Sequence, residues 1–221
     1  MRVVVGMATT NKRKAFAEKA VNSLINHVDE IYLVNNDEEH DDLTDNAKFL
    51  GLSLEYEPCY YFTCDDDIIY PPTYVRDMIA KIEEYKCIVT HHGRMLKGLD
   101  LDYYFEHPAH ICTEEELEDR IIDVAGTGVT AFSTEYFNPI DLVFSKDKKM
   151  SDLIFSLEAA KQGKKIMAVA HDENYIKDLE VPKMLTIGWT QSVLIAHNKR
   201  LFNKDSRQME IANEIYKLKH K

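Results

Sequence analysis

Three consecutive carboxylates, Asp65-Asp66-Asp67, follow the apolar run of residues 60–64 and precede Pro71-Pro72. Alternate side chains of a strand share a face, so we expect Asp65 and Asp67 to point to one side and Asp66 to the other. Two carboxylates about 6 Å apart repel by about 3 kcal/mol at an effective dielectric constant of about 20. A divalent cation removes this repulsion and can also bind a diphosphate. The pattern therefore suggests metal-assisted transfer from a nucleotide diphosphate.

A solvated acidic turn is the alternative for the same residues. The chain has 38 acidic residues among 221, so an acid-x-acid pattern arises by chance and indicates little by itself. Its position is more informative, because ligands of open α/β sheets bind beyond the carboxyl ends of the strands.

Strands and helices alternate along the first part of the chain. The β-branched run at 3–5, a helical pattern through Phe16, Ala20 and Leu24, and a second apolar run at 31–34 form a β-α-β unit, which predicts a parallel sheet. We expect an α/β fold whose mostly parallel sheet is sandwiched by helices. The further expected elements are strands at 60–64, 87–90, 121–125, 129–132 and 166–170, and helices at 44–50, 71–85 and 151–162, with an inserted loop or small hairpin at 94–120.

One domain over residues 1–189, with a helical extension at 190–221 packed on it, is the organisation we expect. No stretch reaches the ~20 apolar residues of a membrane span, so we expect no stable membrane insertion. The four cysteines have no metal-type spacing, and buried thiols in a reducing compartment predict a cytoplasmic protein. A net charge of −11 disfavours broad contact with nucleic acid.

Several common catalytic motifs are missing from the sequence. It contains no G-x-x-x-x-G-K-[ST] phosphate loop, no G-x-S-x-G elbow and no H-E-x-x-H helix, which disfavours P-loop enzymes, α/β-hydrolases and zinc proteases. A nucleotide is therefore expected to bind through carboxylates, a metal ion and the loops at strand ends.

In the order of its motifs, the chain resembles family-2-like glycosyltransferases of the GT-A fold over roughly residues 1–175. The resemblance depends on the order and spacing of several short segments rather than on any one of them. These segments are Val3-Val4-Val5-Gly6-Met7-Ala8-Thr9-Thr10-Asn11-Lys12-Arg13, the run from Val28 to Asn36, Asp65-Asp66-Asp67, Gly126-Thr127-Gly128-Val129-Thr130-Ala131-Phe132, Met150-Ser151-Asp152 and Val169-Ala170-His171.

The resemblance implies a GT-A fold and a metal-dependent, inverting transfer of a sugar from a nucleotide-sugar donor, UDP-sugar favoured, to a hydroxyl acceptor. Asp67 would bind Mn²⁺ or Mg²⁺, with His171 as a further ligand, and Asp152 would be the general base. For the donor nucleotide, the resemblance implies Thr9 and Arg13 beside the nucleoside, Asn36 or Asp37 near the base, and Lys48 in contact with Asp45 or the base. It also implies Asp65 at the ribose and Asp66 as a further donor-site residue. The implied acceptor or sugar residues are His92, Gly126, Gly128 and Trp189.

Each of these residues also has an ordinary structural interpretation. Asp152 could simply favour a helix N-terminus, and His171 could be a strand-end histidine hydrogen-bonded to a loop. His91-His92 could be a surface or core pair, Gly126 and Gly128 could mark a bulge or turn, and Trp189 could anchor the core.

Two other functions remain open at this level. A sugar-phosphate nucleotidylyltransferase shares the sheet and a metal-binding Asp, but such enzymes carry a glycine-rich loop after the first strand, where this chain has only Gly6. The second is a non-catalytic nucleotide-sugar-binding protein. It remains open because the family usually has a Glu-Asp pair at the position of the general base, where this chain has Ser151-Asp152. The acceptor could be a glycan, a protein or a modified nucleobase, and a lipid-linked acceptor would have to be reached peripherally.

Overall fold

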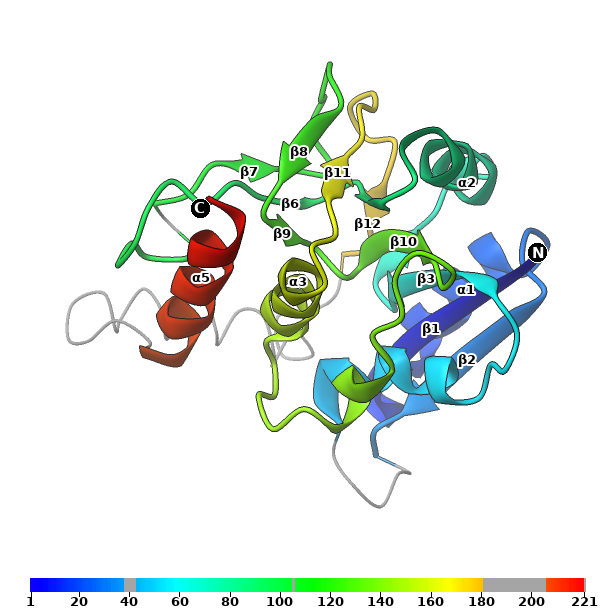
Figure 1. The fold of residues 1–221 in the computed structure, drawn as a ribbon. Coiled ribbons are helices and arrows are strands. Elements are labelled where there is room, and N and C mark those ends of the chain that lie inside the picture. The colour runs from blue at the N-terminus through cyan, green and yellow to red at the C-terminus, as the bar shows by residue number, and fades with distance from the viewer. Residues whose placement is uncertain (38–42, 105, 181–205, 221) are drawn as a thin grey trace.

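A seven-stranded sheet with helices on both faces forms the frame of the protein (Figure 1). The structure is a computed structural model that describes residues 1–37, 43–104, 106–180 and 206–220. The strand order is β2-β1-β3-β10-β5-β11-β8. The bounds are β1 Arg2–Thr9, β2 Glu30–Asn35, β3 Cys59–Asp65, β5 Ile88–Thr90, β8 Arg120–Ile122, β10 Val129–Ser133 and β11 Ile166–Ala168.

Five of these seven strands run in the same direction. β1 pairs in parallel with β2 and β3, and β5 pairs in parallel with β11. β10 lies between β3 and β5 and is antiparallel to both, and β8 is antiparallel to β11. The predicted α/β class with a mostly parallel sheet is therefore confirmed. The inserted antiparallel β10 is a feature that the sequence pattern did not predict.

Two hydrophobic clusters cover the two faces of the sheet, because successive side chains of a strand point to opposite faces. Val4 belongs to one cluster and Val5 to the other, and Tyr61 and Phe62 are divided in the same way. The cluster containing Val5 is closed by helices α1 (Lys14–Leu24) and α2 (Tyr74–Tyr85).

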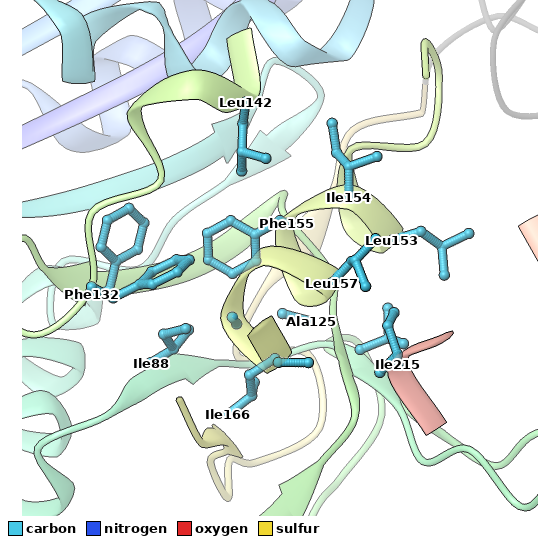
Figure 2. Close-up of a cluster of buried hydrophobic side chains, with 14 of the residues drawn as sticks. Ile88, Ala125, Phe132, Leu142, Leu153, Ile154, Phe155, Leu157, Ile166 and Ile215 are labelled. Atoms are coloured by element: carbon cyan, nitrogen blue, oxygen red, sulfur yellow. The ribbon is translucent and has the colours of Figure 1, made fainter. Parts of the chain in front are cut away.

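The other cluster is closed by the 3-10 helices η2 (Thr44–Ser53) and η3 (Ile140–Phe144), by α3 (Ser151–Lys161) and by α5 (Ser206–Lys219). Figure 2 shows Phe155 of α3 between Phe132 of β10 and Leu142 of η3, with Ile215 of α5 at the far side. The rings of Phe132 and Phe155 have centroids 5.6 Å apart.

The predicted hairpin region at 94–120 contributes to a small second sheet. Its strands are β6 (Gly93–Arg94), β7 (Ala109–His110) and β9 (Val124–Ala125), in the order β7-β6-β9. The single strand expected at 121–125 is divided between two sheets at Asp123, whose carboxylate accepts a hydrogen bond from the backbone N–H of Leu96 at 2.7 Å. The four cysteines are buried and unpaired, as expected.

Three short elements lie outside the two larger sheets, and the C-terminal helix packs against the main sheet. The short elements are the 3-10 turn η1 (Asn11–Arg13) and a two-stranded sheet of β4 (Ile68–Ile69) and β12 (Lys177–Asp178). Helix α5 is tied to the main sheet by the Lys219 ammonium, which donates to the carbonyl oxygens of Ile122 and Asp123 at 3.1 and 3.0 Å. In the described ranges, no helix has the length and apolar character that crossing a bilayer requires. Trp189 lies outside the described residues.

Candidate functional site

The carboxyl ends of β1, β2 and β3 meet at one edge of the sheet. In the strand register, Thr9 is opposite Asn35 of β2, and Ala8 is opposite Asp65 of β3. The acidic triad therefore lies beside the loop that follows β1. This is the position in which open α/β sheets bind ligands.

Asp66 is buried and is held by Thr9 at the end of β1 and by Arg13 of η1. The Thr9 hydroxyl donates to its Oδ2 at 2.7 Å, and the Arg13 guanidinium donates from Nε to Oδ2 at 3.1 Å and from Nη2 to Oδ1 at 2.5 Å. The same Nη2 lies 2.7 Å from Oδ2 of Asp67. The expected alternation of the triad is wrong: β3 ends at Asp65, so Asp66 and Asp67 lie in the following turn and both face Arg13.

Asp65 pairs with Lys48 of η2, whereas Arg13 pairs with Asp66 and Asp67. The Lys48 ammonium donates to Oδ1 of Asp65, and it is buried while the Asp65 carboxylate is 43% exposed. Lys48 reaches this place because Gly6 of β1 has no side chain. A Cβ at Gly6 would stand 1.9 Å from the Lys48 carbonyl oxygen and 2.2 Å from the Tyr61 hydroxyl, which donates to that oxygen at 2.8 Å.

Lys48 neutralises the carboxylates that surround it. Burial by itself would lower the pKa of Lys48, but the carboxylates of Asp65, Asp45 and Asp152 together raise that pKa above its ordinary value. The direct partner of Lys48 is Asp65 and not Asp45, while its contact with a nucleotide base stays a prediction. Asp45 instead accepts hydrogen bonds from the backbone N–H groups of Lys149 and Ser151 at 2.9 and 3.0 Å.

Gly126 and Gly128 both allow close approach of another side chain. A Cβ at Gly128 would stand 2.2 Å from Oδ2 of Asp65, and a Cβ at Gly126 would stand 2.7 Å from Cδ2 of His92. The carbonyl of Gly128 also accepts from the Tyr70 hydroxyl at 2.7 Å, while the Asp65 backbone N–H donates to that hydroxyl at 2.8 Å. The glycines therefore let His92 and Asp65 lie close to the backbone of residues 126–128. Burial lowers the pKa of His92 to about 4.

Asp152 lies in the first turn of α3 and is fixed by Thr127, between the two glycines. Its Oδ1 accepts from the Thr127 backbone N–H at 2.7 Å and from the Thr127 hydroxyl at 2.6 Å. Burial raises the pKa of Asp152. The helix begins at Ser151 with Met150 as its N-cap, and the Ser151 hydroxyl is hydrogen-bonded to the Thr127 hydroxyl at 2.8 Å.

Asn36 and Asp37 follow β2 beside the start of η1. Asn36 donates from Nδ2 to the Thr44 carbonyl at 2.8 Å, and this fixes Oδ1 as the acceptor end of its amide. That Oδ1 is buried and has no hydrogen-bond partner among the described residues. Asp37 accepts from the backbone N–H of Asn11 at 2.7 Å. An unsatisfied buried acceptor at this edge is suited to a ligand N–H group.

His171 belongs to a group of three buried histidines with His91 and His110. Its Nδ1 lies 2.9 Å from the Val169 carbonyl oxygen and 3.3 Å from Nδ1 of His91, and its Nε2 lies 3.3 Å from the Ile111 carbonyl oxygen. Both ring nitrogens face a backbone carbonyl oxygen, and a neutral imidazole can donate to only one of the two. These contacts agree with the structural interpretation of His171, a strand-end histidine bonded to a loop.

Asp178 is a residue of this edge that sequence reasoning missed. β12 pairs with β4 so that Asp178 is opposite Ile68, directly after the triad, and the Leu179 backbone N–H donates to the Asp67 carbonyl at 2.6 Å. Partial desolvation and then the carboxylates of Asp67 and Asp65 raise the pKa of Asp178. No sequence signal marks it, because a two-residue strand that returns from about 110 residues downstream is a tertiary contact.

The comparisons with known proteins assign no family to the chain. No family model and no curated protein matches the sequence. Among solved structures, the crystal structure of A197 from STIV is similar with a TM-score of 0.46 and 16% identity, over 80% of this chain and 84% of that chain. A similarity at this level carries no argument about function.

Proposed function

We propose that the protein is a metal-dependent, inverting glycosyltransferase of the GT-A fold that moves a sugar from a UDP-sugar to a hydroxyl acceptor. The observation that carries this proposal is the convergence of donor-type and acceptor-type groups at one sheet edge. Asp65, Asp66 and Asp67 lie beside Thr9 and Arg13. Thr127 links Asp152 to this group: its backbone N–H donates to Asp152, and its carbonyl oxygen accepts from Lys48. Lys48 in turn binds Asp65.

The carboxylates at this edge fit a hard divalent cation such as Mn²⁺ or Mg²⁺. Among the described residues, the four carboxylates of Asp65, Asp66, Asp67 and Asp178 pair with two cations, Arg13 and Lys48, which leaves a surplus of two negative charges. Among the described residues no three or more His, Cys, Asp or Glu side chains already surround one point, so a diphosphate and water would complete the oxygen ligands. Asp67 and Asp178 would hold the ion, which when bound supplies Lewis-acid stabilisation of the leaving diphosphate.

Asp152 would act on the acceptor hydroxyl. Its Oδ1 is occupied by Thr127, which fixes the orientation of the carboxylate and leaves Oδ2 for a proton. The acceptor oxygen forms a bond to the anomeric carbon as the bond from that carbon to the diphosphate oxygen breaks, and the acceptor proton passes to Oδ2. A carboxyl whose pKa is raised by burial is a better proton acceptor than an ordinary aspartate.

Asn36 supports the choice of uridine. Its Oδ1, which has no partner within the described part of the chain, can receive the imide N–H of uracil, which cytosine lacks at the same ring position. The same group is present in thymine, so dTDP is the competitor that an experiment has to separate. A hydrogen bond from the ribose 2′-hydroxyl, which dTDP lacks, to the Asp65 carboxylate would distinguish the two nucleotides.

Calorimetric titration with UDP, GDP and dTDP, each with and without Mn²⁺, tests the proposal. We expect UDP to bind best and only with Mn²⁺, and Asp67→Asn to abolish this binding. Asp141→Asn, which changes an exposed aspartate of η3, is the matched control. Absence of binding by all three nucleotides would refute the donor site. Binding of UDP without transfer to any hydroxyl acceptor would favour the non-catalytic binder.

A further inference from the structure

Arg13 holds the position on Asp67 that a cation would otherwise take. Its Nη2 lies 2.7 Å from Oδ2 of Asp67, and its side chain is largely enclosed, at 21% exposure. Asp67 is the residue to which the proposed function assigns the divalent cation. The guanidinium and a metal ion therefore compete for the same carboxylate.

The two anchors of Arg13 are unequal. Asp66 holds the guanidinium through two nitrogens, Nε at 3.1 Å and Nη2 at 2.5 Å, and Asp66 is itself fixed by the Thr9 hydroxyl. Asp67 has only the single contact from Nη2, and its carboxylate is more exposed than that of Asp66, at 34% against 7%. Paired parallel hydrogen bonds give an Arg–carboxylate contact both energy and orientation. The contact to Asp67 can therefore be lost while Asp66 keeps the guanidinium in place.

We propose that Arg13 is a built-in counter-ion: it occupies Asp67 while the site has no donor, and it transfers to the diphosphate when a divalent cation takes Asp67. This inference rests on the proposed function for the identity of the diphosphate, but not for the competition between Arg13 and a cation. Only one contact breaks in the exchange, so the reorganisation is small. The guanidinium stays bound to Asp66, and the Nη2 donor that leaves Asp67 is then available to a phosphate oxygen.

The exchange makes two predictions of opposite sign for Arg13→Gln. Without the competing guanidinium, Mn²⁺ alone should bind on the order of tenfold more tightly than to the wild type, a usual size for coupling between two ligands. Without the phosphate partner, UDP in the presence of saturating Mn²⁺ should bind on the order of tenfold more weakly. Loss of one positive charge would by itself shift both affinities in these same directions, so the shifts have to exceed those caused by removing an equal charge nearby.

The experiment measures free Mn²⁺ by electron paramagnetic resonance and UDP binding by calorimetry on the full chain. Lys12→Gln is the matched control, because it removes an equal charge from an exposed neighbour in the same turn. Arg13→Lys keeps a positive charge that competes with Mn²⁺ but lacks the planar guanidinium, so it should retain wild-type Mn²⁺ affinity and lose UDP affinity. The same variant provides the test if Arg13→Gln does not fold.

The outcomes separate this inference from the proposed function. Tighter Mn²⁺ binding by Arg13→Gln supports the inference, even if no nucleotide binds and the proposed function fails. Unchanged or weaker Mn²⁺ binding overturns it, even if UDP binds and the proposed function stands. Failure of the wild type and both Arg13 variants to bind Mn²⁺ overturns both.

Discussion

The buried histidines predict how the stability of the protein depends on pH. His91 and His110 are 3% and 1% exposed. Burial, and then the neighbouring His171, lower the pKa of His91 from 6.5 to about 3. For His110, burial lowers the pKa to about 4, although Glu116 raises it. Both rings are therefore neutral in the folded protein and take up protons on unfolding wherever the pH is below 6.5.

The size of the effect follows from proton linkage. A group whose pKa is lower in the folded state contributes stability above its unfolded pKa, and this contribution declines as the pH falls. For His91, lowering the pH from 7.5 to 5.0 costs about 2 kcal/mol, and His110 costs a similar amount, about 2 kcal/mol. The sum is a large part of the 5–15 kcal/mol that is typical for the stability of a whole protein, so acid should destabilise the protein strongly at about pH 5.

Other groups near His91 titrate too, so the test compares variants. Asp77 on α2 raises the pKa of His91 and so opposes the effect. Elsewhere in the protein, burial raises the pKa values of Asp66, Asp67, Asp152 and Asp178, so these carboxylates also titrate differently in the folded and unfolded states. We expect urea unfolding of His91→Gln at pH 7.5 and 5.0 to show about 2 kcal/mol less loss than the wild type. His27→Gln, the loss of an exposed imidazole, should keep the wild-type loss. Equal losses in His91→Gln and the wild type would refute the neutral, buried state of His91.

Three further predictions concern the site. Asp152→Asn should keep Mn²⁺-dependent UDP binding within about twofold but lower transfer by at least about 10²-fold, the range of general-base contributions; a transfer assay with normal turnover would exclude Asp152 as the base. Gly6→Ala should lose about 3 kcal/mol or more of stability in urea melts, since its Cβ would overlap the backbone of Lys48, whereas Gly163→Ala, with open space around it, should lose less. Asp178→Asn should weaken Mn²⁺ binding on the order of tenfold while His171→Ala leaves it unchanged, and the reverse result would restore His171 as the ligand.

Local sequence patterns predicted most of the elements because their signals are local. The β-branched run near Val4 and the apolar run before Asp65 are strands that begin or end within a few residues of the predicted positions. Helices α2 and α3 follow from apolar residues at helical spacing. The position of the triad at a strand end also followed, since it needs only the strand and the β-α-β order.

Sheet order and side-chain pairing were beyond reach of the sequence, because both depend on contacts between distant segments. Nothing in residues 129–133 marks β10 as antiparallel, since a fully buried strand reads the same in either direction. The pairing of Lys48 with Asp65 depends on the close approach of η2 to Gly6.

The sequence by itself determined the alternation of strands and helices and the three carboxylates at the end of a strand. The tertiary structure decided which charge each carboxylate meets: Lys48 for Asp65, and Arg13 for Asp66 and Asp67. It also decided that Asp178 joins them and that His171 turns to backbone carbonyls. Local propensity fixes the backbone within a segment, whereas the electrostatics of a site are set by groups that folding brings together from distant parts of the chain.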